Sequence, residues 1–413
     1  MSQPLASSET GPWLDDPAHR AYLVADARRQ LDFFDASLGR AGGLAVLDYA
    51  GGPLPGPQEL HTTTRLVHSY GLAQIAGRPD HAGIIDRGMS DLWTRHRDSQ
   101  HGGYVWSVDS EGVADGVKLA YGHVFVLLAA STAKLAGHPD ADRLLADASE
   151  VLDRHYWDDQ MGLFRDEFTR DWQAFSTYRG MNANMHGVEA LLAAHEATGE
   201  ALYLDRARRI FDFFLGRIAP ENGWRIPEHY TEDWQIDRDY EGNPMFRPAG
   251  STPGHSFEMG RLQLQLWDLS GRPDDGAPAR ARKLVQQALD DAWDELRGGF
   301  VYTLAPDGTV ARRARYWWPV TEAIGALAAF QKLDPQPGDE DWYRRCWTFA
   351  DRHLIDHARG GWIPELDDED QPAKAQFAGK PDIYHALQAD LLPLAAGLSH
   401  AIKALKDSRP LAG

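Results

Sequence analysis

The chain has 413 residues, 43% of them hydrophobic and 25% charged, which is an ordinary composition for a folded protein with a sizeable core. Its formal net charge of -19 argues against nucleic acid and anionic membranes as partners, because phosphate groups are bound by clustered Lys and Arg. Cys346 is the only cysteine, which excludes an intrachain disulfide and a zinc site built from several cysteines.

The N-terminal residues 1–16 are polar and lack a positively charged region followed by an apolar core, so no signal peptide is expected. No apolar run approaches the length needed to span a bilayer. These two observations favour a cytoplasmic protein.

A glycine step followed by an aromatic or aliphatic residue recurs along the chain at intervals of about 60 residues. The steps are Gly42-Gly43-Leu44, Gly102-Gly103-Tyr104, Met161-Gly162-Leu163-Phe164, Asn222-Gly223-Trp224, Gly298-Gly299-Phe300 and Gly360-Gly361-Trp362. A fixed period repeated this often indicates a repeat architecture with a short hairpin-like turn in each unit.

Between these turns, two kinds of helical segment alternate. The amphipathic kind, charged on one side, suits outer helices: 18–38, 80–95, 140–156, 201–218, 277–296 and 339–356. The more apolar kind suits a buried inner ring: 64–76, 117–136, 182–198, 253–270, 318–332 and 384–405. Six helix pairs predict an all-α (α/α)6 barrel that forms a single domain over residues 1–413. The longest interval contains an insertion at about 228–250, which is predicted to form a lid or rim over one mouth.

The fourth apolar segment begins with the most suggestive stretch of the sequence. Thr252 is a plausible N-cap and Pro253 fits the first helical position. His255 and Glu258 follow on one face, where the helix N-terminus favours a neutral imidazole and Glu258 could orient the ring. The alternative is that His255 only satisfies the cap and Glu258 only complements the helix dipole.

Other polar residues gather near the starts of the apolar segments. They are Arg65 and His68, Tyr121 and His123, Asn182 and His186, Trp317, Trp318 and Glu322, and His385. If the inner helices run parallel, these residues converge on one mouth of the barrel, as in a polyol-binding site.

Each member also has a structural interpretation. Arg65 could pair with an outer helix, Tyr121 and Trp317 could be packing residues, and Asn182 with His186 could form a buried hydrogen-bonded pair. His68 and His123 are interpreted either as core residues or as residues that support the site from behind, Glu322 could hold an arginine, and His385 could satisfy its helix start. Zinc ligation by His255, Glu258, His186 and His385 is disfavoured because the His-Glu-x-x-His pattern is absent and no aspartate cluster completes the set, so no metal is expected.

Four stretches resemble the N-acylglucosamine 2-epimerase superfamily, and within it the branch of bacterial mannose and sulfoquinovose isomerases. They are Asn182-Ala183-Asn184-Met185-His186, Thr252-Pro253-Gly254-His255-Ser256-Phe257-Glu258, Trp317-Trp318-Pro319-Val320-Thr321-Glu322-Ala323 and Lys380-Pro381-Asp382-Ile383-Tyr384-His385-Ala386. The resemblance covers nearly the whole chain and implies an (α/α)6 barrel that isomerises free aldoses without a cofactor. The chain departs from the usual pattern at Met259-Gly260, where a tryptophan often follows the glutamate.

The resemblance also implies roles for individual residues. His255 and His385 would be the acid/base pair, with Glu258 supporting the first. Arg65, Tyr121, Asn182, His186 and Arg247 would hold the sugar, and Trp317 or Trp318 would line the pocket.

The function expected on these grounds is the interconversion of D-mannose and D-fructose, with lyxose and xylulose as further substrates, through a cis-enediol. Alternatives are a sugar 2-epimerase or a sulfoquinovose isomerase of the same superfamily. A glycoside hydrolase, with Glu228, Glu365 and Asp166 as candidate carboxyl groups, and a non-catalytic sugar-binding scaffold are the remaining alternatives. The expected partner is a monosaccharide, and the sequence carries no signal for oligomeric state.

Overall fold

Two sets of six helices alternate along the part of the chain that the computed structural model describes, which is residues 5–7, 11–39, 43–240, 242–243, 246–399 and 401–412. The inner set is α2 (Leu60–Ile75), α4 (Ala120–Leu135), α6 (Met181–Thr198), α9 (Pro253–Leu269), α11 (Trp317–Leu333) and α13 (Tyr384–Leu394). The outer set is α1 (Pro17–Phe34), α3 (Ile84–Asp91), α5 (Ala141–Val151), α7 (Ala201–Phe211), α10 (Ala277–Ala292) and α12 (Asp339–Phe349).

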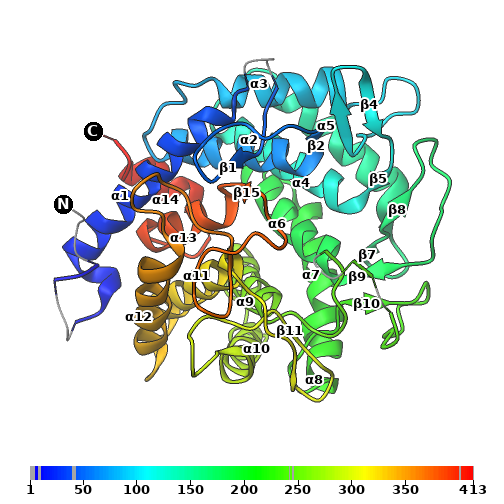
Figure 1. Ribbon diagram of the computed structural model, residues 1–413. Helices are drawn as coiled ribbons and strands as arrows, with labels where there is room; N and C mark the ends of the chain where they lie inside the picture. The colour runs from blue at the N-terminus through cyan, green and yellow to red at the C-terminus, as the bar shows by residue number, and fades with distance from the viewer. Residues whose placement is uncertain are drawn as a thin grey trace.

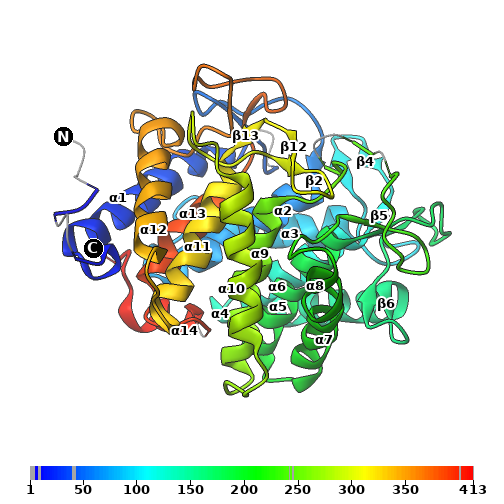
Figure 2. The same cartoon turned by 90° about the horizontal axis from the view of Figure 1, so that it is seen from below.

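The inner helices form a closed ring. Each contacts the next in chain order, and α13 contacts α2, so the ring has no open edge. The first outer helix, α1, packs on the last inner helix, α13 (Figure 1), while α10 and α12 lie against α9 and α11 (Figure 2). The predicted (α/α)6 barrel is therefore confirmed, because apolar inner helices and amphipathic outer helices can bury their apolar surfaces only in two such layers.

Short backbone ladders join consecutive repeats just before the inner helices. The pairs are β2 (Gln58–Glu59) with β3 (Ser107–Asp109), β5 (Lys118–Leu119) with β8 (Glu167–Phe168), β9 (Arg179–Gly180) with β10 (His229–Tyr230), β13 (Arg315–Tyr316) with β14 (Glu365–Leu366), and β15 (Gly379–Lys380) with β1 (Leu47–Asp48). Before α9, the bridge between Ser251 and Leu304 takes the same place. All six inner helices therefore begin at one rim, as the sequence hypothesis requires.

The remaining strands make local hairpins. They are β4 (Gly112–Asp115) beside β3, β6 (Trp157–Asp158) with β7 (Leu163–Phe164), and β11 (Thr303–Leu304) with β12 (Val310–Arg312). Short π-helical turns extend four of the outer helices: Leu92–His96, Leu152–Tyr156, Asp212–Ile218 and Ala350–Leu354. They account for the greater length of the predicted outer segments.

The repeated glycine steps are tight turns, as expected, although Gly42 lies outside the described residues. Gly102 and Gly103 have φ angles of 74° and 68°, which residues with a Cβ rarely adopt. The N–H of Gly102 donates to the carbonyl oxygen of Asp98 at 2.8 Å. Pairs 158/162, 294/298 and 356/360 repeat this Asp–Gly bond at 2.7–2.8 Å. The aspartate is thus part of the repeat unit.

Buried lysines fasten two of these turns to the following repeat. Lys118, 0% exposed, donates to the Asp98 carboxylate at 3.2 Å and to the Gly102 carbonyl oxygen at 2.6 Å. Lys380, 1% exposed, makes the corresponding bonds to Asp356 at 2.9 Å and to the carbonyl oxygen of Gly360. Because each lysine lies two to four residues before an inner helix, its ammonium group links the rim to the turn.

One predicted helix is wrong. The segment 384–405 forms two helices, α13 and α14 (Ala401–Ser408), because Pro393 cannot donate a helical hydrogen bond and α13 ends at Leu394. The Lys332 ammonium donates to the carbonyl oxygens of Leu392 and Ala395 at this helix end, both at 2.5 Å. Among the described residues, no helix is long and apolar enough to cross a lipid bilayer.

The turn-fastening contact predicts a measurable loss of stability. Lys118→Met should lower the free energy of unfolding by about 2 kcal/mol, because the buried Asp98 carboxylate keeps only the partly exposed Arg170 as its cation. Urea unfolding measures this. The matched control Lys134→Met, at a surface pair with Asp142, should cost less than about 1 kcal/mol. Equal losses in the two variants would contradict the role of the buried lysine.

Candidate functional site

The start of α9 presents His255 to the rim, with its side chain 12% exposed. Its Nδ1 lies 2.8 Å from a carboxylate oxygen of Glu228, and the same oxygen accepts the backbone N–H of Thr252 at 3.1 Å. Pro253 occupies the first turn as expected, but the Thr252 side chain makes no capping hydrogen bond. Glu228 therefore caps the helix, which was expected of Thr252, and orients the imidazole, which was expected of Glu258.

The start of α13 presents the second histidine in a matching arrangement. The Nδ1 of His385 lies 2.8 Å from one carboxylate oxygen of Glu322, on α11. The other oxygen of Glu322 lies 3.3 Å from the Arg261 guanidinium, so Glu322 does hold an arginine, as the sequence suggested. In both pairs the carboxylate binds Nδ1, which directs the opposite ring nitrogen, Nε2, away from the carboxylate.

Both imidazoles lie against one indole ring. The ring centroids of His255 and His385 are 5.0 and 5.8 Å from that of Trp318, with tilts of 33° and 34°. Trp317 meets His385 edge-on at 6.2 Å and also packs on Phe377. Helices far apart in the sequence thus bring the two predicted bases to the same part of the rim, with Trp318 as their shared neighbour.

Arg65 is held from several sides at the same rim. It donates to Asp382 and to the Tyr121 hydroxyl, each at 2.8 Å. Its guanidinium also lies 4.7 Å from the ring centroids of Phe125 and Tyr384. The suggested salt bridge to an outer helix is wrong, because Asp382 directly precedes the inner helix α13. His68 and His123 are buried and hydrogen-bonded to Thr132 and to backbone groups, which confirms their interpretation as core residues.

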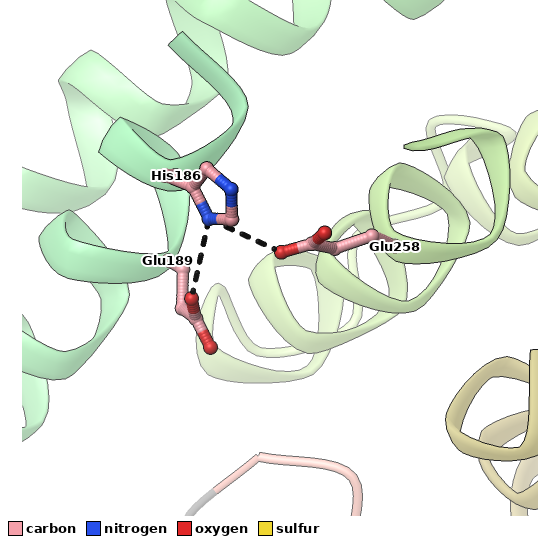
Figure 3. Close-up of side chains that lie close together, drawn as sticks. All are labelled: His186, Glu189 and Glu258. Carbon is pink, nitrogen blue, oxygen red and sulfur yellow. Dashed lines mark ion pairs between the residues drawn. The ribbon is translucent and has the colours of Figure 1, made fainter. Parts of the chain in front are cut away.

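Glu258 lies deeper in the barrel and faces α6. Its nearest carboxylate oxygen is 3.4 Å from Nδ1 of His186 (Figure 3), so the expectation that it supports His255 is wrong: a residue three positions along α9 points further toward the barrel axis. Burial raises the pKa of Glu258 well above its ordinary value, and the neighbouring Glu322 and Glu189 carboxylates raise it further. Burial lowers the pKa of His186 to about 4. Burial therefore favours the uncharged form of each group, the carboxylic acid of Glu258 and the neutral imidazole of His186.

Several buried polar atoms around the barrel axis have no hydrogen-bonding partner within the described parts of the chain. They are Nε of Arg65, Oδ1 of Asn182, Nδ1 of His186, Oγ1 of Thr252, both carboxylate oxygens of Glu258, Nε of Arg261 and Nε2 of Gln388. Native proteins leave few buried polar groups without partners, so a concentration of donors and acceptors here indicates a site for a hydroxyl-rich ligand.

The same cluster contains metal-ligand residue types. The ligand atoms of His186, Glu189 and Glu258 lie within 4.8 Å of one another, as do those of Glu258, Glu322 and His385. The Arg261 guanidinium already provides a positive charge here, 3.3 Å from Glu322 and 3.9 Å from Glu189. This pairing weakens the attraction of the carboxylates for a cation.

Arg247 stands apart from the other predicted residues. It projects from the rim insertion, 2.5 Å from the Glu167 carboxylate, and its guanidinium lies 3.9 Å from the centroid of the Tyr178 ring. A further bond of 3.3 Å joins it to the Tyr240 hydroxyl. Arg247 thus ties the insertion to the preceding repeat.

Sequence reasoning missed four residues of the site and misassigned a fifth. Arg261, Glu189, Asp382 and Gln388 were not identified as members, and Glu228 was considered only as a hydrolase carboxylate. Arg261 could have been found from its helical spacing, one turn beyond Glu258. Glu228 offers no such signal, since it reaches His255 through the fold of the insertion.

Comparison with known proteins gives a consistent result. The N-acylglucosamine 2-epimerase family model matches residues 42–389. A D-mannose isomerase of Thermobifida fusca is 41% identical, over 94% of this chain and 98% of that protein. A crystal structure of D-mannose isomerase superposes with a TM-score of 0.85 at 32% identity, covering 91% of this chain and 97% of that one. Cellobiose 2-epimerase from Spirochaeta thermophila, at 23% identity and a TM-score of 0.80 over 94% of this chain and 96% of that one, shares the fold.

The buried acid predicts a pH-dependent effect on stability. Folding raises the pKa of Glu258. The free energy of unfolding is therefore highest below the pKa that Glu258 has in the unfolded state, and it falls as pH rises toward the pKa in the folded state. Glu258→Gln should therefore gain stability relative to the wild type between pH 5 and pH 8, by more than about 1 kcal/mol. Urea unfolding at both pH values tests this, with exposed Glu221→Gln as the control. A difference that does not change with pH would contradict a protonated Glu258.

Proposed function

Since this chain belongs to the N-acylglucosamine 2-epimerase family, we propose that it is an aldose–ketose isomerase that interconverts D-mannose and D-fructose. The observation that carries the proposal is the pair of imidazoles, His255 and His385, each held at Nδ1 by a carboxylate and both packed on Trp318. The names of the relatives supply the substrate.

Two bases are sufficient for this reaction. In the open-chain aldose, one imidazole removes the C2 proton while the other protonates O1, which gives a cis-enediol. Return of the first proton to C1, with removal of the O2 proton, then gives the ketose, and both imidazoles recover their starting state. Arg65, beside the Tyr121 hydroxyl, is placed to stabilise negative charge that develops on the enediolate.

The charges of the site favour an uncharged sugar. Its three arginines are each paired with a carboxylate: Arg65 with Asp382, Arg261 with Glu322, and Arg247 with Glu167. The charge of each arginine is thus already opposed by a carboxylate, which disfavours the binding of a sulfonate or phosphate and argues against the sulfoquinovose alternative. In this proposal Asn182, His186, Tyr121, Trp317 and Trp318 contact the sugar, and Arg247 contributes from the rim.

The other candidates have weaker support. Of the carboxylates considered for a hydrolase, Glu228 holds His255. Asp166 accepts the backbone N–H of Gly180 and Glu365 accepts that of Gln376, each at 2.9 Å. These contacts give each carboxylate a structural partner. A 2-epimerase remains the nearest alternative, because a second base on the opposite face of C2 would return the proton with inversion.

The direct test is incubation with D-mannose in deuterated water, followed by NMR. We expect D-fructose with deuterium at C1. D-glucose without fructose would favour the 2-epimerase, and the absence of both ketose and C2 exchange across common hexoses would exclude the isomerase. His255→Asn and His385→Asn should each lower kcat by about a thousandfold, while exposed His81→Asn should not change it.

Glu228 is proposed as a positioning residue, and its variant has a specific signature. Glu228→Gln preserves the shape of the side chain but removes the charge that stabilises the His255 imidazolium. We expect kcat to fall about a hundredfold with little change in KM. Glu322→Gln should lower kcat less, because Arg261 already opposes the Glu322 charge. Equal losses of kcat in the two variants would count against this assignment.

A further inference from the structure

His186 and Glu258 have no task in the enediol steps, although they face each other from the neighbouring inner helices α6 and α9. Nδ1 of His186 and the nearer carboxylate oxygen of Glu258 are 3.4 Å apart, longer than a usual hydrogen bond (Figure 3). Neither that nitrogen nor either Glu258 oxygen has a hydrogen-bonding partner in the described chain. A sugar oxygen reaching this pair would meet an acid and a base without competing for an existing bond.

Burial and the surrounding charges favour the uncharged form of Glu258. Glu322 and Glu189 both face Arg261, at 3.3 and 3.9 Å, and Glu189 also accepts the Tyr384 hydroxyl. One cation thus serves two carboxylates, and Glu258 is the third carboxyl group of the cluster. The pKa of Glu258 is raised well above its ordinary value, mainly by burial, although Arg261 and Arg65 oppose the shift.

His186 completes the pair as the base. Its pKa is lowered to about 4, mainly by burial, so its ring carries one proton and one free lone pair at neutral pH. Glu189, 3.8 Å from Nδ1, and Arg65 act on it in opposite directions. An uncharged acid beside an uncharged base can give one proton and take another in the same step.

We propose that Glu258 and His186 catalyse the opening and closing of the pyranose ring, which gives the protein an aldose anomerase activity that does not require His255 or His385. The inference rests on the proposed function only in that the same site must bind aldoses.

The step balances without any further reactant. The Glu258 carboxyl group gives its proton to the ring oxygen O5 as the C1–O5 bond breaks and its electron pair moves to O5. The O1 hydroxyl gives its proton to Nδ1 of His186 as the C1=O1 bond forms. Transfer of that proton from His186 to Glu258 restores both groups. Closure on either face of C1 then gives either anomer.

The position of the pair suits this task. Glu258 lies about one helical turn beyond His255 on α9, and His186 lies one turn beyond Asn182 on α6. The His186 ring is 5.3 Å from that of Tyr121, whose hydroxyl binds Arg65. Ring opening would therefore take place beside the enediol site and deliver the open chain directly to it.

The test uses 2-deoxy-D-glucose, which has anomers but no O2, so it cannot form an enediol or a ketose. Exchange between its anomers is measured by NMR exchange spectroscopy, and mutarotation of freshly dissolved α-D-mannose by polarimetry. The wild type should accelerate both. The double variant His255→Asn, His385→Asn should retain the acceleration of mannose mutarotation although it produces no fructose.

Glu258→Gln and His186→Asn should each reduce the anomerisation rate by about a hundredfold, and Glu221→Gln should not. Thermal unfolding midpoints confirm that the variants are folded, and His186→Asn provides a second test if Glu258→Gln is not. Full anomerisation by folded Glu258→Gln or His186→Asn, or its loss in the double histidine variant, would overturn the proposal. A wild type that anomerises sugars but produces no ketose would instead overturn the isomerase assignment.

Discussion

The site depends on a ring of backbone pairs only two residues long. Each pair joins the residues before one inner helix to the following repeat, and the pair of β15 with β1 closes the ring. Backbone hydrogen bonds of this kind do not depend on the side chains at those positions. The rim can therefore hold six helix starts in one place while the first turns of those helices carry polar residues.

Burying those polar residues has a cost that the barrel only partly offsets. Glu189 and Glu322 share one guanidinium, Glu258 is a third carboxyl group beside them, and several donors and acceptors have no partner within the described chain. Such groups lower stability unless a ligand or a proton satisfies them. The well-packed helices around them supply the compensating stability, which is a common arrangement in active sites.

The two histidines show how similar local geometry can have different electrostatic consequences. Each Nδ1 faces a carboxylate at 2.8 Å. Glu228 also accepts a neutral backbone N–H, whereas Glu322 also faces a guanidinium. Arg261 therefore offsets part of the attraction between Glu322 and His385, whereas no cation among the described residues offsets the attraction between Glu228 and His255 in the same way. Two bases with unequal support can divide the work at carbon and at oxygen between them.

The sequence by itself determined the repeat, the two kinds of helix and the helix starts that carry the site, because apolar periodicity and glycine turns are local properties. It also indicated His255, His385 and Glu322, since they lie in recognisable stretches at those starts. Only the tertiary structure decided which carboxylate serves which histidine. The Glu228 contact spans an insertion, and the direction of Glu258 depends on how α9 is rotated against α6. At the end of the last inner helix, just after Pro393, Lys332 from another helix binds the carbonyl oxygens of Leu392 and Ala395. Contacts between distant segments depend on how helices pack, and helical periodicity in one segment does not specify that packing.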